Sequence, residues 1–226
     1  MRIDMEKQIV LEQVSKIFGK DDALVEALSD VDVEFEKGEF AAITGTSGSG
    51  KTTLLRIIGL LDSVSKGRLL YEGKDMAEES DAVLSALRNQ KIGYVFQDYH
   101  LIPELTAREN IMLPQVIGKK KKGKIVDEIL DKLQLTPRQS HYPSQMSGGQ
   151  QQRVAIGRAL VNQPELLLCD EPTGNLDQKN SEEVMDILLQ INEEMNTTVI
   201  IVTHDEKIAA RCKRIIHIED GKIVDA

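Results

Sequence analysis

A glycine-rich segment between a short apolar run and a helical pattern constrains the fold of this chain more than any other feature. The apolar run covers Phe40 to Thr44, and the glycine cluster begins directly after it at Gly45. The pattern that follows places four apolar side chains on one helix face, those of Leu54, Leu55, Ile58 and Leu61. A strand that enters a helix through a glycine loop is typical of βαβ units, so the segment predicts a parallel sheet.

The rest of the chain predicts an α/β fold with a mainly parallel core. Strand patterns recur at Leu166 to Cys169, Val199 to Val202 and Ile215 to Ile218, with a helix between about Ser181 and Met195. Asp220-Gly221, between two apolar residues, predicts a tight hairpin turn. Near the N-terminus, Val31, Val33 and Phe35 alternate with acidic residues, which indicates a half-exposed antiparallel strand.

The region from Asp98 to Val161 has no strand pattern and is expected to be helical. Thr106 and Glu109 form a capping-box pattern that opens one of its helices. We therefore expect a single domain over residues 1–226. In it, residues 1–97 and 162–226 form the α/β core with an N-terminal antiparallel β part, and residues 98–161 form an inserted helical subdomain.

Composition excludes several classes of protein. The chain has 28 Lys and Arg against 37 Asp and Glu, a net charge of −9, which argues against a general nucleic-acid partner. Apolar runs such as Ile57 to Leu61 are far shorter than the roughly 20 residues that cross a bilayer, and no signal-peptide core is present. Cys169 and Cys212 have no paired spacing. We expect a cytosolic chain in a reducing compartment that contacts a membrane only through another protein.

The glycine-rich segment matches the P-loop pattern without a gap, as Gly45-Thr46-Ser47-Gly48-Ser49-Gly50-Lys51-Thr52. Its glycines allow the backbone to aim successive N–H groups at phosphate oxygens, and the following helix adds its positive N-terminal dipole. Lys51 is expected to reach the β- and γ-phosphates, and the Thr52 hydroxyl to ligate Mg²⁺. The alternative is a glycine- and serine-rich turn that only connects strand and helix.

A second set of candidate residues lies at the end of a buried strand. The apolar run Leu166 to Cys169 ends in Asp170 and Glu171. With a P-loop elsewhere in the chain, this position suits a carboxylate that holds Mg²⁺, which we assign to Asp170. Glu171 is then expected to polarise the attacking water.

Met146-Ser147-Gly148-Gly149-Gln150 and the helix after it closely resemble the signature motif of ABC ATPases. In that family two subunits pack head to tail, so that the signature of one completes the ATP site of the other. Ser147 and Gln150 form a capping-box pattern, and Gly148 and Gly149 leave room for a phosphate at the helix N-terminus. The resemblance implies the ABC ATPase fold, with a RecA-like core.

Other segments match the family in the same order along nearly the whole chain. Gln97 resembles the Q-loop glutamine, which touches Mg²⁺ and couples the site to a partner. Asp177, in Gly174-Asn175-Leu176-Asp177, resembles the D-loop residue at the dimer seam, and His204 the switch histidine that contacts the γ-phosphate. Phe18 lies where the family stacks an aromatic ring on adenine. The resemblance thus adds Phe18, Thr53 and Gln97 to the expected ATP site, and Gln97 to the Mg²⁺ ligands.

Three stretches point to one branch of the family, the MacB/LolD-like branch of lipoprotein release, macrolide efflux and antimicrobial-peptide resistance. They are Phe96 to Asn110, Gly59 to Asp62 and Glu171 to Asp177. The resemblance implies an ATPase that binds ATP and Mg²⁺, forms a homodimer, and drives a separate transmembrane permease from the inner face of the cell membrane. Lys51, Glu171 and His204 would be its catalytic residues. Its transported substrate, transport direction and permease, its dimerisation without ATP, and the role of the basic run Lys119 to Lys124 stay open.

Two alternative functions belong to other classes. One is an ABC ATPase that acts on ribosomes or DNA; such proteins usually carry two ATPase units or a long coiled-coil insertion, and this chain has neither. The other is a regulatory subunit that binds ATP without hydrolysing it, against which the presence of Lys51, Asp170, Glu171 and His204 argues.

Overall fold

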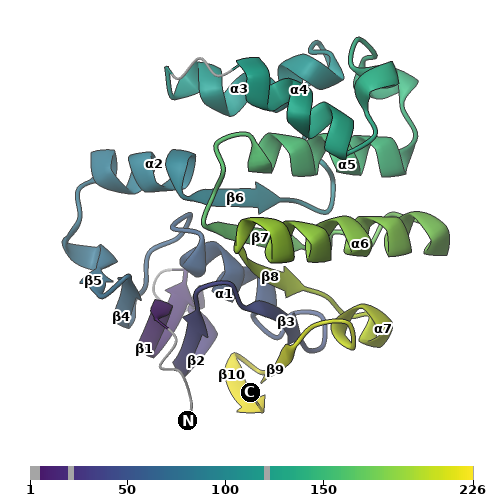
Figure 1. Cartoon of the computed structure of the whole chain (residues 1–226). Coiled ribbons are helices and arrows are strands. Elements are labelled where there is room, and N and C mark those ends of the chain that lie inside the picture. The colour runs from purple at the N-terminus through teal and green to yellow at the C-terminus, as the bar shows by residue number, and fades with distance from the viewer. Residues whose placement is uncertain (1–5, 20–22, 120–122, 226) are drawn as a thin grey trace. The chain divides into compact units, whose positions relative to one another are not determined.

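The computed structural model describes residues 6–19, 23–119 and 123–225 (Figure 1). It divides into two compact units, one of residues 1–85 and 198–226 and one of residues 86–197. We call them unit 1 and unit 2. Residues 120–122 of the basic run Lys119 to Lys124 lie outside the described residues. The single domain with an insertion at 98–161 stays a prediction.

Unit 1 contains a four-stranded antiparallel sheet in the order β2-β1-β4-β5. Its strands are β1 (Lys7–Phe18), β2 (Val25–Glu36), β4 (Lys66–Tyr71) and β5 (Lys74–Asp75). Val31, Val33 and Phe35 of β2 are buried, whereas Asp32 between them is exposed. The predicted half-exposed antiparallel strand is therefore confirmed.

Unit 1 also holds the parallel strands that lead to the glycine-rich segment. β3 (Phe40–Thr44) lies between β8 (Thr198–Val202) and β9 (Arg214–Glu219) and runs parallel to both. β10 (Lys222–Asp225) turns back antiparallel to β9, which confirms the predicted hairpin. The first four residues of β3 have no exposed surface, as expected for a strand covered on both faces.

The helices of unit 1 are α1 (Lys51–Ile58) and the short α7 (Glu206–Ala209), and a 3₁₀ turn at Met76–Glu78 follows β5. Leu54, Leu55 and Ile58 are buried as expected, but Leu61 is 41% exposed, so its predicted place on the helix face is wrong. The helix ends at Ile58 because Leu60 takes a left-handed φ of 57°. Helix α2 (Asp81–Gln90) begins in the residue range of unit 1 and ends in that of unit 2.

Unit 2 is built on the parallel pair β6 (Ile92–Val95) and β7 (Leu166–Asp170). Its helices are α3 (Ala107–Ile117), α4 (Gly123–Lys132), α5 (Gly148–Leu160) and α6 (Gln178–Met195), with 3₁₀ turns at Thr136–Arg138 and Pro143–Gln145. Helix α5 packs on β6, with α3 on its other side (Figure 1). Between 98 and 161 the described residues form no strand, which confirms the predicted helical region.

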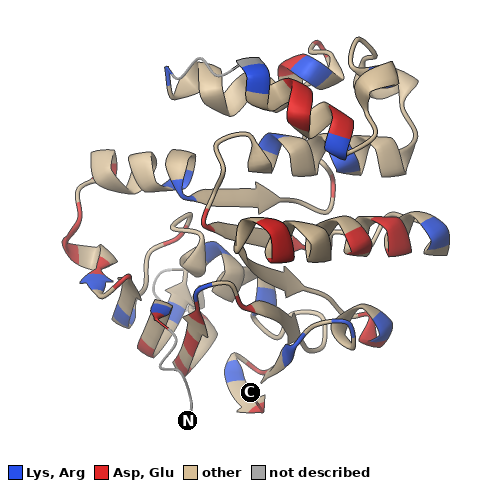
Figure 2. Cartoon of the chain, viewed as in Figure 1, with Lys and Arg blue, Asp and Glu red and all other residues tan. Residues whose placement is uncertain are grey.

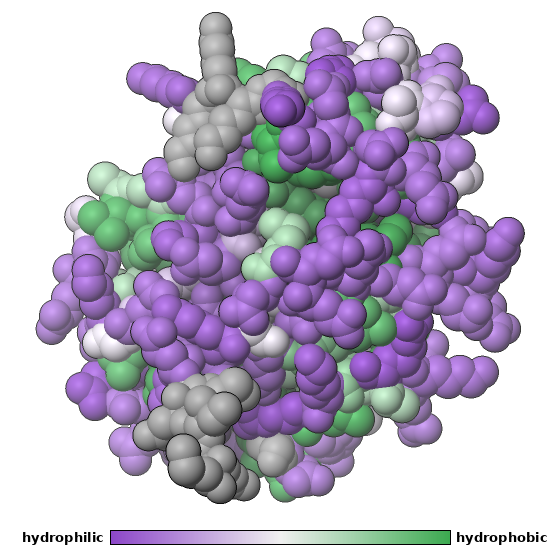
Figure 3. Space-filling view, in the orientation of Figure 1, coloured by the Kyte–Doolittle hydropathy of each residue, from purple (hydrophilic) through white to green (hydrophobic). Residues whose placement is uncertain are grey.

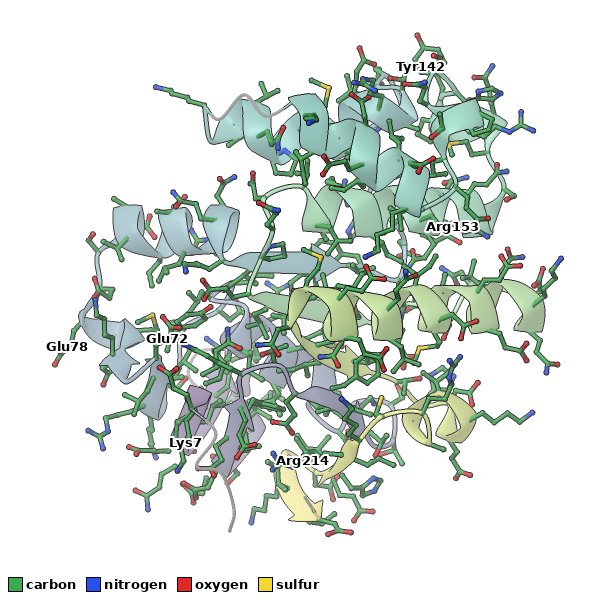
Figure 4. The ribbon with its side chains drawn as sticks, in the orientation of Figure 1. Lys7, Glu72, Glu78, Tyr142, Arg153 and Arg214 are labelled. Carbon is green, nitrogen blue, oxygen red and sulfur yellow. The ribbon has the colours of Figure 1, made fainter. Side chains whose placement is uncertain are left out.

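Polar side chains define the helix starts of unit 2. Thr106 and Glu109 form the predicted capping box of α3, and the Thr106 amide donates to the Glu109 carboxylate at 2.8 Å. Asp177 caps α6, which therefore begins at Gln178, three residues before the predicted start. Arg153, labelled in Figure 4, projects from α5 toward α6 and forms an ion pair with Glu183.

Charged side chains are spread over both units, and acidic residues recur along α6 (Figure 2). The face seen in Figure 3 is mostly hydrophilic, with hydrophobic residues in small groups. Within the described ranges, none of the helices combines the length and the apolar character that a membrane span requires.

Candidate nucleotide-binding site

The glycine-rich segment forms a loop between β3 and α1, where the sequence places it. Gly45, Gly48 and Gly50 have φ angles of 147°, 81° and 105°. A side chain at Gly45 would place its Cβ 2.2 Å from the carbonyl oxygen of Ile218, so the loop starts in direct contact with the backbone of β9. Helix α1 begins at Lys51 and aims its N-terminal amides at the loop.

The Lys51 side chain lies within this loop. Its Nζ donates to the carbonyl oxygens of Gly45 at 2.9 Å and Thr46 at 2.7 Å, and the residue is only 8% exposed. The side chain of Lys51 thus points into a cradle of backbone N–H groups, where it can contact an anion directly. The loop therefore has the chemistry to bind an anion with several oxygens, such as a polyphosphate.

Other polar groups complete the loop. The Ser49 side chain is 2% exposed, and its Oγ has no hydrogen-bond partner among the described residues. In the first turn of α1, Thr52 is exposed and Thr53 is half-buried. The exposed outer part of the loop consists of Thr46, Ser47 and Gly48. The hydroxyl oxygen of Thr52 is a hard donor of the kind that Mg²⁺ prefers.

His204 lies at the same sheet edge as the phosphate loop. Ile43 of β3 pairs in register with Val202 of β8, and the Thr203 amide donates to the Ile43 carbonyl at 3.1 Å. Because the strands are parallel, the loop that starts at Gly45 and the exposed His204 both follow carboxyl ends of neighbouring strands. Ligands of open α/β sheets bind at this edge.

Phe18 lies elsewhere in unit 1, at the end of β1, and is 41% exposed. The ammonium of Lys16 sits 5.0 Å from the centre of its ring, in a cation–π contact. An exposed aromatic ring of this kind offers a surface on which a planar base can stack.

In unit 2, the two acidic residues follow β7 and Gln97 follows β6. Val95 pairs in register with Cys169, so the parallel strands bring Gln97 and the Asp170–Glu171 pair to one sheet edge. Asp170 and Glu171 are both half-buried. Glu171 has a φ of 45°, a left-handed conformation that is costly for a residue with a Cβ and is found preferentially at functional sites.

The loop after Glu171 packs against Gln97. The Cβ of a side chain at Gly174 would lie 3.0 Å from Gln97 Nε2, so the glycine permits this approach. The Asn175 side chain donates to the Gln97 carbonyl at 3.1 Å and to Asp98 Oδ1 at 3.2 Å. The segments that follow the two strands are therefore joined.

The signature segment forms the predicted N-terminus of α5. The Ser147 amide donates to Gln150 Oε1 at 3.1 Å, and the Gln150 amide donates to Ser147 Oγ at 3.4 Å. Gly148 and Gly149 also have a packing role that the motif alone did not predict. Their Cβ atoms would lie 3.0 Å from the Tyr99 hydroxyl and 2.3 Å from Asn180 Oδ1.

Asp177 is exposed, and its carboxylate accepts from the Asn180 amide at 2.9 Å and from Asn180 Nδ2 at 2.8 Å. The backbone hydrogen bond, and then the side-chain bond, from Asn180 hold the pKa of Asp177 below its ordinary value. The carboxylate is therefore charged at neutral pH. Its contact with Asn180 also connects the start of α6 to Gly149.

Sequence reasoning missed one half-buried charge in this unit. The Arg158 guanidinium, on α5, donates to the carbonyl of Tyr99 at 2.7 Å and also to that of His100. Both accepting residues have positive φ angles, 59° and 46°. Burial lowers the pKa of Arg158. Burial, and to a smaller extent the negative charge of Asp98, raises the pKa of Tyr99. No spacing rule links residues so far apart, so only the folded chain reveals this support for the segment after Gln97.

The expected site residues therefore fall into two sets. Unit 1 brings residues 45–53 and His204 to one sheet edge and holds Phe18 on its other sheet. Unit 2 brings Gln97, Asp170 and Glu171 to its own sheet edge, with the signature and Asp177 at the starts of α5 and α6. Among the described residues, no group of three or more His, Cys, Asp or Glu side chains could hold a metal ion. Mg²⁺ usually takes one or two carboxylates together with phosphate oxygens.

Comparisons with known proteins show the family of the chain. A family described as ABC transporter matches residues 28–174. The lipoprotein-releasing system ATP-binding protein LolD 1 of Rhodopseudomonas palustris is 48% identical over 202 residues, 88% of this chain and 89% of that protein. The macrolide export ATP-binding/permease protein MacB of Mannheimia succiniciproducens is 46% identical over 220 residues, which cover 96% of this chain but 34% of that longer protein.

A solved structure shows the same fold. It is a dimeric, post-hydrolysis state of the ATP-binding cassette MJ0796 bound to ADP and Pi, with a TM-score of 0.88 and 40% identity. The match covers 96% of this chain and 97% of that chain. The matches confirm the predicted fold and the resemblance, and they favour a transporter ATPase over an ABC ATPase that acts on ribosomes or DNA. The chain belongs to the ABC transporter family, as one of its ATP-binding and ATP-hydrolysing cassettes of the LolD and MacB type.

Proposed function

We propose that the chain drives a separate transmembrane permease by closing, with a second copy of itself, around ATP. The single observation that carries this proposal is the buried Lys51 ammonium, held at the centre of a glycine loop that opens α1. Binding of the nucleotide would favour the closed dimer, and hydrolysis would release it.

The residue roles follow from the chemistry of each side chain. Lys51 and the loop Gly45 to Thr53 would bind the phosphates, Phe18 the adenine, and His204 the γ-phosphate. Glu171 would accept a proton from the attacking water, because a half-buried carboxylate at the end of a strand is a fixed general base. Mg²⁺, when bound to Thr52, Gln97 and Asp170, supplies positive charge to the phosphate oxygens.

The second copy would supply the rest of the site. The capped N-terminus of α5, Ser147 to Gln150, presents backbone amides and a positive dipole that suit a γ-phosphate of the opposite subunit. Asp177, exposed at the start of α6, would lie at the seam between the copies. The dimeric state of the cassette MJ0796 supports this arrangement.

The names of the relatives suggest the process that the chain serves. LolD is named for lipoprotein release and MacB for macrolide export, and MacB combines ATP-binding and permease functions in one protein. We infer export or extraction of lipoproteins, peptides or antibiotics, with the cassette at the cytoplasmic face of the membrane through its permease. The segment from Gln97 to Asn110, which leads from β6 into α3 and contacts Arg158 and Asn175, is the surface we assign to the permease.

The test is Glu171→Gln, with Glu165→Gln as a matched control. Both glutamates flank β7, but Glu165 pairs with Lys91 at its amino end. E171Q should bind ATP, elute as a stable dimer with ATP in size-exclusion chromatography, and lose phosphate release; E165Q should turn over normally. Normal turnover by E171Q would refute the assigned base.

A further inference from the structure

The turn between β9 and β10 contacts the phosphate loop through its backbone. Asp220 and Gly221 have φ angles of 44° and 76°, the left-handed pair of a tight hairpin turn. The Gly221 amide donates to the Ser49 carbonyl at 2.9 Å, and the Gly221 carbonyl accepts from the Ser29 amide at 2.9 Å. One residue near the end of the chain thus joins the loop to β2.

The contact leaves no space for a side chain. The Cβ of a residue at position 221 would lie 2.9 Å from the carbonyl oxygen of Ala27 and 3.1 Å from Leu28 Cα, both in the backbone of β2. A Cβ at Gly50 would lie 2.5 Å from the same Ala27 oxygen and 3.6 Å from Gly221 Cα. The last part of the loop, the turn and β2 are therefore in backbone-to-backbone contact.

The hydrogen bond to Ser49 also sets the direction of the next amide. The described chain has no cis peptide bonds, so the C=O of Ser49 and the N–H of Gly50 point in opposite directions in one plane. Because the Ser49 carbonyl points to Gly221, the Gly50 amide must point away from the turn. The preceding peptide, between Gly48 and Ser49, is held as well, because the Ser49 amide donates to the Thr46 carbonyl at 3.2 Å.

We propose that Gly221 is a positioning residue of the nucleotide site, which fixes the peptide between Ser49 and Gly50 so that the Gly50 amide is preorganised for a phosphate oxygen. The inference rests on the proposed function, since it assigns a support to the loop that binds ATP. Preorganised donors bind their ligand without the cost of being ordered first. A displaced Gly221 should therefore weaken the binding of ATP.

The chain contains a matched control for this residue. Glu72 and Gly73, in the turn between β4 and β5, have φ angles of 48° and 79°, and nothing lies within 4 Å of a Cβ at Gly73. Gly73→Ala and Gly221→Ala thus impose the same left-handed alanine on a two-residue hairpin turn. Only Gly221→Ala brings a Cβ against the backbone of β2, which would displace the turn that is bonded to the phosphate loop.

The experiment measures ATP dissociation constants, and the KM and kcat of hydrolysis, at a temperature at which circular dichroism shows both variants folded. G221A should raise the dissociation constant and KM by about tenfold or more, and G73A by less than about twofold. Equal effects of the two variants, or binding by G221A like that of the wild type, would overturn the role of Gly221. Wild-type protein that fails to bind ATP would instead overturn the proposed function.

If G221A does not fold, hydrogen exchange on the wild type tests whether the Gly221 turn supports the nucleotide site. Saturating ATP and Mg²⁺ should slow exchange of the Gly221 amide, which is bonded to the loop, and leave the Gly73 amide unchanged. An unchanged Gly221 amide in a protein shown to bind ATP contradicts the proposal.

Discussion

The side-chain amide of Asn175 donates a hydrogen bond to the backbone carbonyl of Gln97 at 3.1 Å. This bond joins the segments that leave the carboxyl ends of β6 and β7. At the amino ends of the same strands, Asn162 donates to the carbonyl of Asn89 at 2.7 Å. The strand pair is thus tied at both ends by an asparagine, but only one end carries candidate catalytic residues.

The two asparagine bonds, at opposite ends of the strand pair, allow a first prediction. Asn175→Ala should lower kcat by about 3- to 10-fold, the value of one hydrogen bond, because Gln97 loses its bond to the segment that follows Glu171. Asn162→Ala should lower the unfolding midpoint in urea without lowering kcat. A kcat of N175A equal to that of the wild type would show that the link does not contribute to turnover.

The phosphate loop depends on Lys51. Lys51→Ala should weaken ATP binding by about 10- to 100-fold, the loss of a charge-assisted hydrogen bond. The control is Lys66→Ala, which removes an exposed ammonium from β4 and should leave binding unchanged. Isothermal titration with ATP measures both, and unchanged affinity in K51A would disprove the phosphate-binding role of the loop.

The head-to-tail arrangement is tested at Ser147. Ser147→Arg should abolish hydrolysis but leave ATP binding by the monomer, because Ser147 would serve the opposite subunit. Thr106→Arg disrupts the equivalent capping box of α3 and separates the cost of a lost cap from a blocked interface. If S147R also abolished monomer binding, the assignment of the signature to the other copy would be wrong.

The packing of β6 on α5 predicts a stability difference. A Cβ at Gly93 would lie 2.7 Å from the Ala159 carbonyl oxygen, whereas one at Gly157 would meet only side-chain ends of Ile111 and Leu133 at 3.0 Å. Gly93→Ala should therefore cost about 1–3 kcal/mol of unfolding free energy. Gly157→Ala should cost less, since the helix gains alanine and flexible side chains can move. Urea denaturation compares them, and an equal cost would contradict the tight contact.

The capping box of α3 predicts a pH effect. The Thr106 backbone amide, and then its hydroxyl, hold the pKa of Glu109 below its ordinary value of 4.5. A lowered pKa stabilises the fold above pH 4.5, and this contribution is lost as the pH falls through the folded-state value. Thr106→Ala should raise the pKa toward 4.5, and Thr106→Ser, which keeps the hydroxyl, should not. Side-chain NMR titration of Glu109 would show whether the hydroxyl contributes.

Local patterns explain which parts could be predicted from the sequence. Three features depend only on residues that are close together in the sequence, so their spacing predicts their structure. They are the phosphate loop, the two capping boxes and the Asp220-Gly221 turn. The order of the motifs, together with the family resemblance, predicted the fold and the ATPase activity that the comparisons support. The roles of the individual site residues stay predictions.

Long-range packing explains what could not be predicted. β1 has several register shifts against β2 and a left-handed residue, Gln13, so its buried residues do not alternate and the period-2 pattern is lost. The contacts of Gly149 with Asn180 and of Arg158 with Tyr99 join residues that are far apart in the chain. Such contacts depend on how α5 packs, which no local pattern encodes.

The pairing of β3 with β8 and β9 has a consequence for synthesis on the ribosome. Ala41 of β3 pairs with Arg214 of β9, so the strand that leads to the phosphate loop gains this neighbour only after β9 has been made. Contacts between residues so far apart in the sequence form late, so the edges of β3 stay unpaired during translation. A nascent chain that has already emerged past Thr52 should therefore be unable to capture ATP until β8 and β9 have been made.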